Sequence, residues 1–138
     1  MKYLIHIFIV LIFLNVISFA NDFQSAKKIS LKKDETLKIL VKYGAREKLF
    51  KMRWTLYKNN GLVIHRSYDT IIAQNILYNR TRNRNFRLEL KPRGADFYNV
   101  PYILVKFKKF DYLKHEAMFE LYLSDEHRQI NLKYLKNI

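Results

Sequence analysis

The strongest constraint on the fold of this chain is a two-residue alternation that begins at Leu49. Apolar side chains alternate there with polar ones: Phe50, Met52, Trp54 and Leu56 against Lys51, Arg53, Thr55 and Tyr57. This is the period of a β-strand that buries one face, so the apolar row is predicted to point inward and Tyr57 outward. Asn59, Asn60 and Gly61 follow, and these residue types tolerate positive φ. We therefore predict a β-hairpin with Leu62–Arg66 as its second strand.

The same alternation recurs along the rest of the chain, with turn residues between the segments. Further strands are predicted at 28–33, 36–43, 86–91, 102–110, 117–123 and 130–136. Residues 68–78 fit either a helical face or a strand, and we favour a strand or a bent connection because the neighbours are strands. Residues 22–28 are expected to form a mobile lead.

Seven or eight strands at a spacing of about ten residues are typical of a β-sandwich or a small barrel. We expect an all-β fold, a single-domain antiparallel β-sandwich, with an immunoglobulin-like arrangement as the first choice. A membrane-spanning barrel is the main structural alternative. The outward positions argue against it, because they hold Lys and Arg, which are costly on a lipid-facing surface.

The first twenty residues have the pattern of a secretory signal peptide. Lys2 precedes a long apolar run that ends in Ser18-Phe19-Ala20, a small-x-small sequence that suits a signal peptidase. A retained membrane anchor is the alternative, although His6 and Asn15 weaken a spanning helix. We predict cleavage after residue 20, which leaves one domain at 21–138 without a stable transmembrane span.

Composition limits the chemistry and suggests a compartment. The chain contains no cysteine, so thiol chemistry, disulfides and cysteine metal sites are excluded. Abundant Lys, Asn, Ile, Phe and Tyr suggest an AT-rich bacterial genome, and we expect a periplasmic or secreted protein. The 26 basic residues outnumber 12 acidic ones, which gives a net charge of +14, or +13 once Lys2 is removed. Such a charge attracts anions of many kinds.

The most concentrated basic segment runs from Asn79 to Arg93 and is the leading candidate binding site. It carries Arg80, Arg82, Arg84, Arg87, Lys91 and Arg93 against the single acid Glu89. Arginine pairs well with phosphates and carboxylates, so we predict a site for an anion or an acidic partner. The alternative is a solvated loop in a protein that is basic throughout.

Tyr98 and Tyr102 lie in an irregular aromatic segment, Phe97–Tyr102, that offers a second candidate contact surface. Tyrosine is enriched at protein interfaces, so both residues are hypothetical aromatic anchors for a partner. The same side chains would also serve to seal the open end of a sandwich. The sequence leaves these two roles open.

The sequence favours binding over catalysis. His65, His115 and His127 would remain after cleavage and suggest, as the alternative, a small secreted hydrolase or nuclease with histidine acid–base chemistry. They show no metal-ligand spacing, and we find no nucleophile or phosphate-loop motif, so we assign no catalytic residue, metal or cofactor. We expect a non-enzymatic binding or accessory module whose partner is an acidic protein or an anionic envelope polymer.

Two other roles remain open at the level of sequence. Nucleic acid is a disfavoured partner, because export separates the protein from it and the aromatics beside cations mostly face the core. The third possibility is a structural subunit that adds an exposed strand edge to a neighbour.

Overall fold

The computed structural model describes residues 23–92 and 99–135, which form nine β-strands. The predicted signal peptide, residues 1–20, lies outside the described residues. The strands are β1 (Ser25–Lys32), β2 (Leu37–Tyr43), β3 (Arg46–Lys58), β4 (Gly61–Tyr68), β5 (Ile71–Tyr78), β6 (Asn85–Glu89), β7 (Tyr102–Asp111), β8 (Glu116–Ser124) and β9 (Asn131–Leu135). Across the described ranges no helix is long and apolar enough to cross a membrane.

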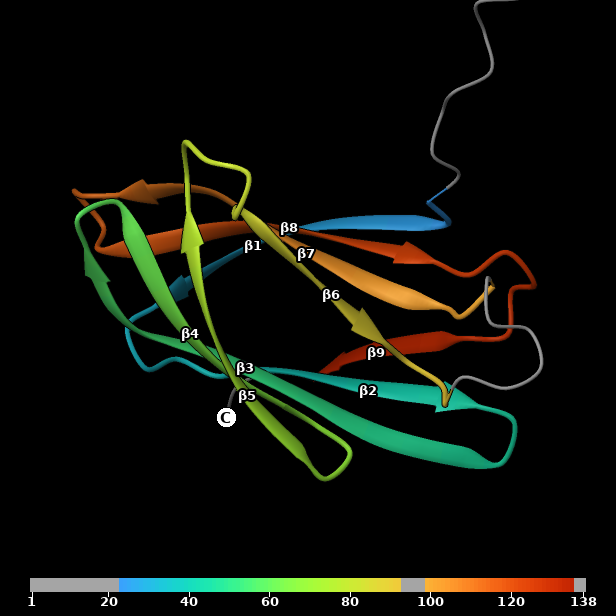
Figure 1. Cartoon of the computed structure of the whole chain (residues 1–138). Coiled ribbons are helices and arrows are strands. Elements are labelled where there is room, and N and C mark those ends of the chain that lie inside the picture. The colour runs from blue at the N-terminus through green and yellow to red at the C-terminus, as the bar shows by residue number, and fades with distance from the viewer. Residues whose placement is uncertain (1–22, 93–98, 136–138) are drawn as a thin grey trace, which may run out of the picture.

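The strands form two antiparallel sheets that pack face to face as two layers (Figure 1). The four-stranded sheet has the order β1-β8-β7-β6, and the five-stranded sheet has the order β5-β4-β3-β2-β9. Each sheet consists of consecutive hairpins with one distant strand added, β1 beside β8 and β9 beside β2. The all-β sandwich-like prediction is therefore confirmed at this level.

The core lies between the sheets and is built by the alternation seen in the sequence. Every second residue is buried along β2 and β8. Ile39 and Phe50 from one sheet and Phe107 from the other have no exposed surface. Each such side chain contributes about 1.5 to 3 kcal/mol when fully buried.

A β-bulge in β3 reverses the predicted facing of two residues. The register of β3 against β4 shifts between Trp54 and Leu56, so the alternation breaks at that point. Leu56, predicted to point inward, is 51% exposed. Tyr57, predicted to point outward, packs against the core and stacks on Phe110 with ring centroids 4.2 Å apart. The prediction was wrong here because the bulge adds one residue and inverts the faces beyond it.

The predicted β3–β4 hairpin forms, but its glycine has a different role from the one expected. Asn59 and Asn60 adopt the positive φ angles, 53° and 61°. Gly61 begins β4, and a Cβ there would lie 2.9 Å from Cε1 of Tyr78. Gly61 therefore allows the Tyr78 ring to approach, and the two asparagines make the turn.

Other sequence predictions are refined by the strand assignments. The ambiguous residues 68–78 contain strand β5, which brings the count to nine instead of seven or eight. β1 begins at Ser25, so part of the expected lead is paired with β8. The immunoglobulin-like arrangement is not confirmed. β2 and β3 pair within one sheet, whereas the second and third strands of an immunoglobulin constant domain lie in opposite sheets.

Two buried side-chain hydrogen bonds connect the layers. Trp54 of β3 donates its indole Nε1–H to the carbonyl oxygen of Leu31 in β1, at 2.7 Å. Tyr68 of β4 donates its hydroxyl to the carbonyl oxygen of Leu90, just after β6, also at 2.7 Å. Both bonds are buried, so each satisfies a carbonyl group that water does not reach.

Candidate functional site

The structure divides the predicted basic segment into parts with different roles. Arg80 and Arg82 are exposed in the loop between β5 and β6. Arg84 is half-buried, and its guanidinium donates to the carbonyl oxygen of Asn79. Its own carbonyl accepts the N–H of Phe107 at 2.8 Å. Arg84 thus holds the loop against β7, while Arg80 and Arg82 are available to solvent.

Arg87 and Tyr102, both predicted as site residues, lie together on the outward side of the four-stranded sheet. The guanidinium carbon of Arg87 lies 3.8 Å from the centroid of the Tyr102 ring. Such a cation–π contact places the guanidinium over the ring, and guanidinium N–H groups can donate to carboxylate or phosphate oxygens. Tyr102 is half-buried under this contact and Arg87 is exposed.

Lys91 belongs to a different region. Its Nζ donates to the side-chain oxygen of Gln129 and lies 5.7 Å from the centroid of the Tyr43 ring. These residues border a hollow that Gly44 and Arg46 also line. Lys91 follows β6, at the end of the strand away from the Arg80 loop. Arg93 and Tyr98, the remaining predicted site residues, lie outside the described residues.

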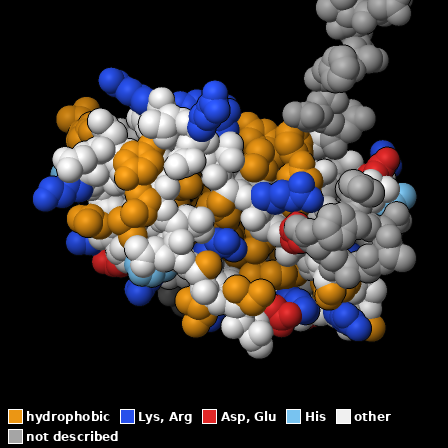
Figure 2. All heavy atoms as spheres, in the orientation of Figure 1, with side chains coloured by type: hydrophobic (Ala, Val, Ile, Leu, Met, Phe, Trp, Pro, Cys, Tyr) orange, Lys and Arg blue, Asp and Glu red, His pale blue; other side chains and the backbone are white. Residues whose placement is uncertain are grey.

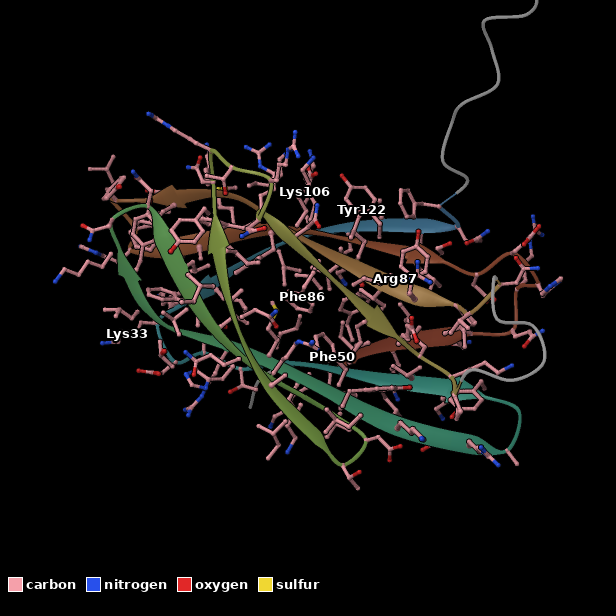
Figure 3. The ribbon with its side chains drawn as sticks, in the orientation of Figure 1. Lys33, Phe50, Phe86, Arg87, Lys106 and Tyr122 are labelled. Carbon is pink, nitrogen blue, oxygen red and sulfur yellow. The ribbon has the colours of Figure 1, made fainter. Side chains whose placement is uncertain are left out.

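The strand pairing brings additional cations and an aromatic residue beside Arg87 and Tyr102. Lys106 of β7 lies opposite Asn85 on one side and Glu120 of β8 on the other. Lys28 of β1 also lies opposite Glu120, on the side of β8 away from β7. We call this surface the basic sheet face; it comprises Lys28, Arg87, Glu89, Tyr102, Lys106, Lys108, Glu120 and Tyr122. Arg87, Lys106 and Tyr122 lie on its outer side, while Phe86 points between the sheets (Figure 3).

Glu120 organises the centre of the basic sheet face. Its carboxylate accepts a hydrogen bond from the Tyr122 hydroxyl and lies 3.3 Å from Nζ of Lys108, which sits at a bulge in β7. The hydrogen bond from Tyr122, followed by the bond and charge of Lys108 and the charge of Lys28, lowers the pKa of Glu120. The same carboxylate raises the pKa of Tyr122. Glu120 therefore remains ionised and fixes two side chains of the face.

Five members of this face lie outside the segments singled out from the sequence: Lys28, Lys106, Lys108, Glu120 and Tyr122. They come from β1, β7 and β8. Most of the domain's sequence separates β1 from β8, although the two strands are paired. The alternation of each strand does mark these positions as outward. Only the order of the strands shows that they share one surface.

His115 and His127 lie at opposite ends of β8 and do not form a catalytic pair. His115 lies in the turn before β8 and His127 in the turn after it, so the length of a nine-residue strand, about 30 Å, separates them. His65 lies on β4. Within residues 23–92 and 99–135, no three His, Asp or Glu side chains gather as a metal site.

The arrangement of the basic sheet face suits contact with an anionic surface. Lys28, Lys106 and Lys108 lie around the carboxylate of Glu120, and Arg87 lies on the same side of β6 as Glu89. Four cations thus share the face with two carboxylates, so the face is locally positive. It is the outer surface of a β-sheet, and basic side chains outnumber acidic ones in the visible view (Figure 2). A broad charged surface of this kind favours an extended partner over a small enclosed ligand. No protein-family model, curated protein or solved structure matches this chain.

Proposed function

We propose that this protein is an exported, non-enzymatic binding module of the bacterial periplasm or envelope. Its basic sheet face captures an anionic partner, an acidic protein or an anionic envelope polymer. The observation that carries this proposal is that Lys28, Lys106 and Arg87, from three different strands, lie on one face of the sheet, with Glu120 between Lys28 and Lys106. Export is supported by the signal-like sequence of residues 1–20.

The proposed capture uses fixed and adaptable groups together. The ring of Tyr102 supports the guanidinium of Arg87, which is thereby oriented for paired hydrogen bonds to a carboxylate or phosphate. Lys106 and Lys28 supply flexible charges on either side of Glu120. Arg80 and Arg82, in the adjacent exposed loop, extend the positive field beyond the sheet. The cations are solvent-exposed or half-buried, so binding weakens as salt rises.

A charge-reversal pair tests this proposal. The variant Arg87→Glu with Lys106→Glu reverses two charges on the basic sheet face. The control, Lys33→Glu with Lys114→Glu, makes the same change in net charge at two exposed turn residues elsewhere. The purified exported proteins are immobilised, exposed to an envelope extract and washed across a salt series. We expect the face variant to lose about tenfold or more in affinity and the control to lose about twofold or less.

The outcomes separate specific capture from general attraction of anions. Retention of one acidic protein by wild type and control identifies a protein partner, and retention of lipopolysaccharide alone identifies a polymer. Equal losses in the two variants would show that net charge, rather than this face, governs binding. Matching thermal midpoints for both variants would confirm that the substitutions leave the fold intact.

A further inference from the structure

The four outer strands of the two sheets differ in how they are protected against pairing with another chain. β1 carries Lys27, Lys28 and Lys32, β6 carries Arg87 and Glu89, and β9 carries Lys133. Charged residues on an edge strand oppose the addition of a further strand. β5, with the sequence IIAQNILY, has eight residues and no charge. It is the exception in a chain in which 28% of the residues are charged.

The backbone of β5 presents hydrogen-bonding groups to its open side. The N–H of Tyr78 donates to the carbonyl oxygen of Asn83 at 2.8 Å, and therefore points away from β4. Direction alternates along a strand, so Ile72, Gln74 and Ile76 also direct their N–H and C=O groups away from β4. Among the described strands, β4 alone pairs with β5.

The side chains of the same residues are apolar and uncovered. Ile72 is 83% exposed and Ile76 is 47% exposed, and Gln74 is exposed between them. Ile76 lies opposite Val63, which lies opposite the exposed Leu56. An apolar row therefore runs across β3, β4 and β5 on the outer face of the sheet and ends at the β5 edge. A long, uncharged, apolar edge of this kind is suited to adding another strand.

We propose that two copies of this protein associate through antiparallel pairing of their β5 strands, with the twofold axis at Gln74. In this register Ile72 of one copy lies opposite Ile76 of the second copy, and Gln74 lies opposite its own equivalent. The backbone N–H and C=O groups of all three residues point away from β4, so each opposed pair exchanges N–H···O=C hydrogen bonds. The sequence of the strand is thus complementary to itself around Gln74. An unrelated partner would need a different strand whose sequence matches this one.

Charge also distinguishes this association from anion capture. Each copy carries a net charge of +14, or +13 after cleavage, but the contact strand is neutral. The two copies therefore repel each other without placing like charges at the interface. Salt screens that repulsion and should strengthen the dimer, whereas it weakens anion binding. The two activities use different surfaces, and neither requires the other.

A cysteine placed at the twofold axis tests the register directly. The chain contains no cysteine, so a disulfide in Gln74→Cys can form only between the introduced residues. Directly opposed residues in a hydrogen-bonded antiparallel pair have Cα atoms about 5.5 Å apart, within the range for a disulfide. We expect mild oxidation to convert Gln74→Cys to a covalent dimer. The control Leu113→Cys, at a residue that is 96% exposed, should remain largely monomeric.

A second variant measures the equilibrium without cross-linking. Gln74→Lys places two like charges opposite each other at the axis, and the exposed site should tolerate lysine without unfolding. Sedimentation equilibrium of the exported protein should show a dimer that tightens from about 0.05 to 0.5 M NaCl. We expect Gln74→Lys to raise its dissociation constant about tenfold or more, and Leu113→Lys to change it about twofold or less.

Three results would overturn the proposal: a wild-type protein that stays monomeric at high salt, a dimer that Gln74→Lys leaves unchanged, or equal cross-linking of the two cysteine variants. Cross-linking of Gln74→Cys to a different extract protein, without a homodimer, would assign the edge to a foreign strand and reject the second copy. Anion capture by Gln74→Lys should be unimpaired, so failure of this inference and failure of the proposed function are distinguishable.

Discussion

Asn60 shows how one backbone angle specifies the β3–β4 hairpin. Its φ of 61° is costly for most L-residues but tolerated by asparagine and glycine. We expect Asn60→Ala to lower the free energy of unfolding by about 1 kcal/mol, and Asn60→Gly to leave it nearly unchanged. Urea denaturation of the two variants measures both effects. Equal destabilisation would instead implicate the side chain, which lies 3.5 Å from the Tyr57 hydroxyl.

The partly buried Tyr57 makes the stability of the fold depend on pH in the alkaline range. Burial, followed by its hydrogen bond with Tyr112, raises the pKa of Tyr57 from 10.0 to about 12. Because the folded pKa exceeds the unfolded one, the associated stability is present below about pH 10 and is lost as pH rises toward about 12. We expect the free energy of unfolding of the wild type to fall more steeply across this interval than that of Tyr57→Phe. Parallel pH curves would contradict this assignment.

At the scale of elements, Trp54 attaches the edge strand β1 to the opposite sheet. Its bond to Leu31 is buried, so Trp54→Phe would leave a carbonyl without its partner and remove packing. We expect a loss of about 1 to 3 kcal/mol and faster amide hydrogen exchange throughout β1.

Phe110→Leu provides the matched control for that experiment. The Phe110 ring meets Trp54 edge-on at 5.6 Å, so this variant disturbs the packing of the indole and retains its N–H. A selective increase of exchange in β1 should follow only from Trp54→Phe. If both variants accelerated amide hydrogen exchange in β1 equally, the hydrogen bond would not be what holds β1 to the opposite sheet.

The whole molecule is dominated by its excess of positive charge. Ion pairs such as Lys42–Glu47 and Lys108–Glu120 occur, but the 12 acidic residues are too few to pair with all 26 basic ones. Added salt should therefore weaken the repulsion among basic residues more than the attraction within ion pairs. We expect the thermal midpoint to rise by about 2 to 5 °C between about 0.05 and 0.5 M NaCl. Lys33→Glu with Lys114→Glu should show a smaller rise, and a fall in the wild-type midpoint would contradict the expectation.

Much of the fold could be predicted because β-strand alternation is local. The inward faces of β2, β6 and β8 were each visible in their own sequence, and β5 was favoured as a strand by its neighbours. The bulge before Leu56 was not visible, because an added residue leaves the same apolar alternation in the sequence. The immunoglobulin-like expectation relied on strand number and spacing, which do not determine strand order.

The sequence by itself determined the strands, most turns, the absence of thiol chemistry and the excess of positive charge, since these depend on neighbouring residues or on composition. Only the tertiary structure decided that Lys28, Arg87 and Lys106 share one surface and that Lys91 lies elsewhere. It also decided that the uncharged β5 is an edge strand. These features depend on long-range strand pairing, in which one sheet order is chosen by the packing of the whole core rather than by any local segment.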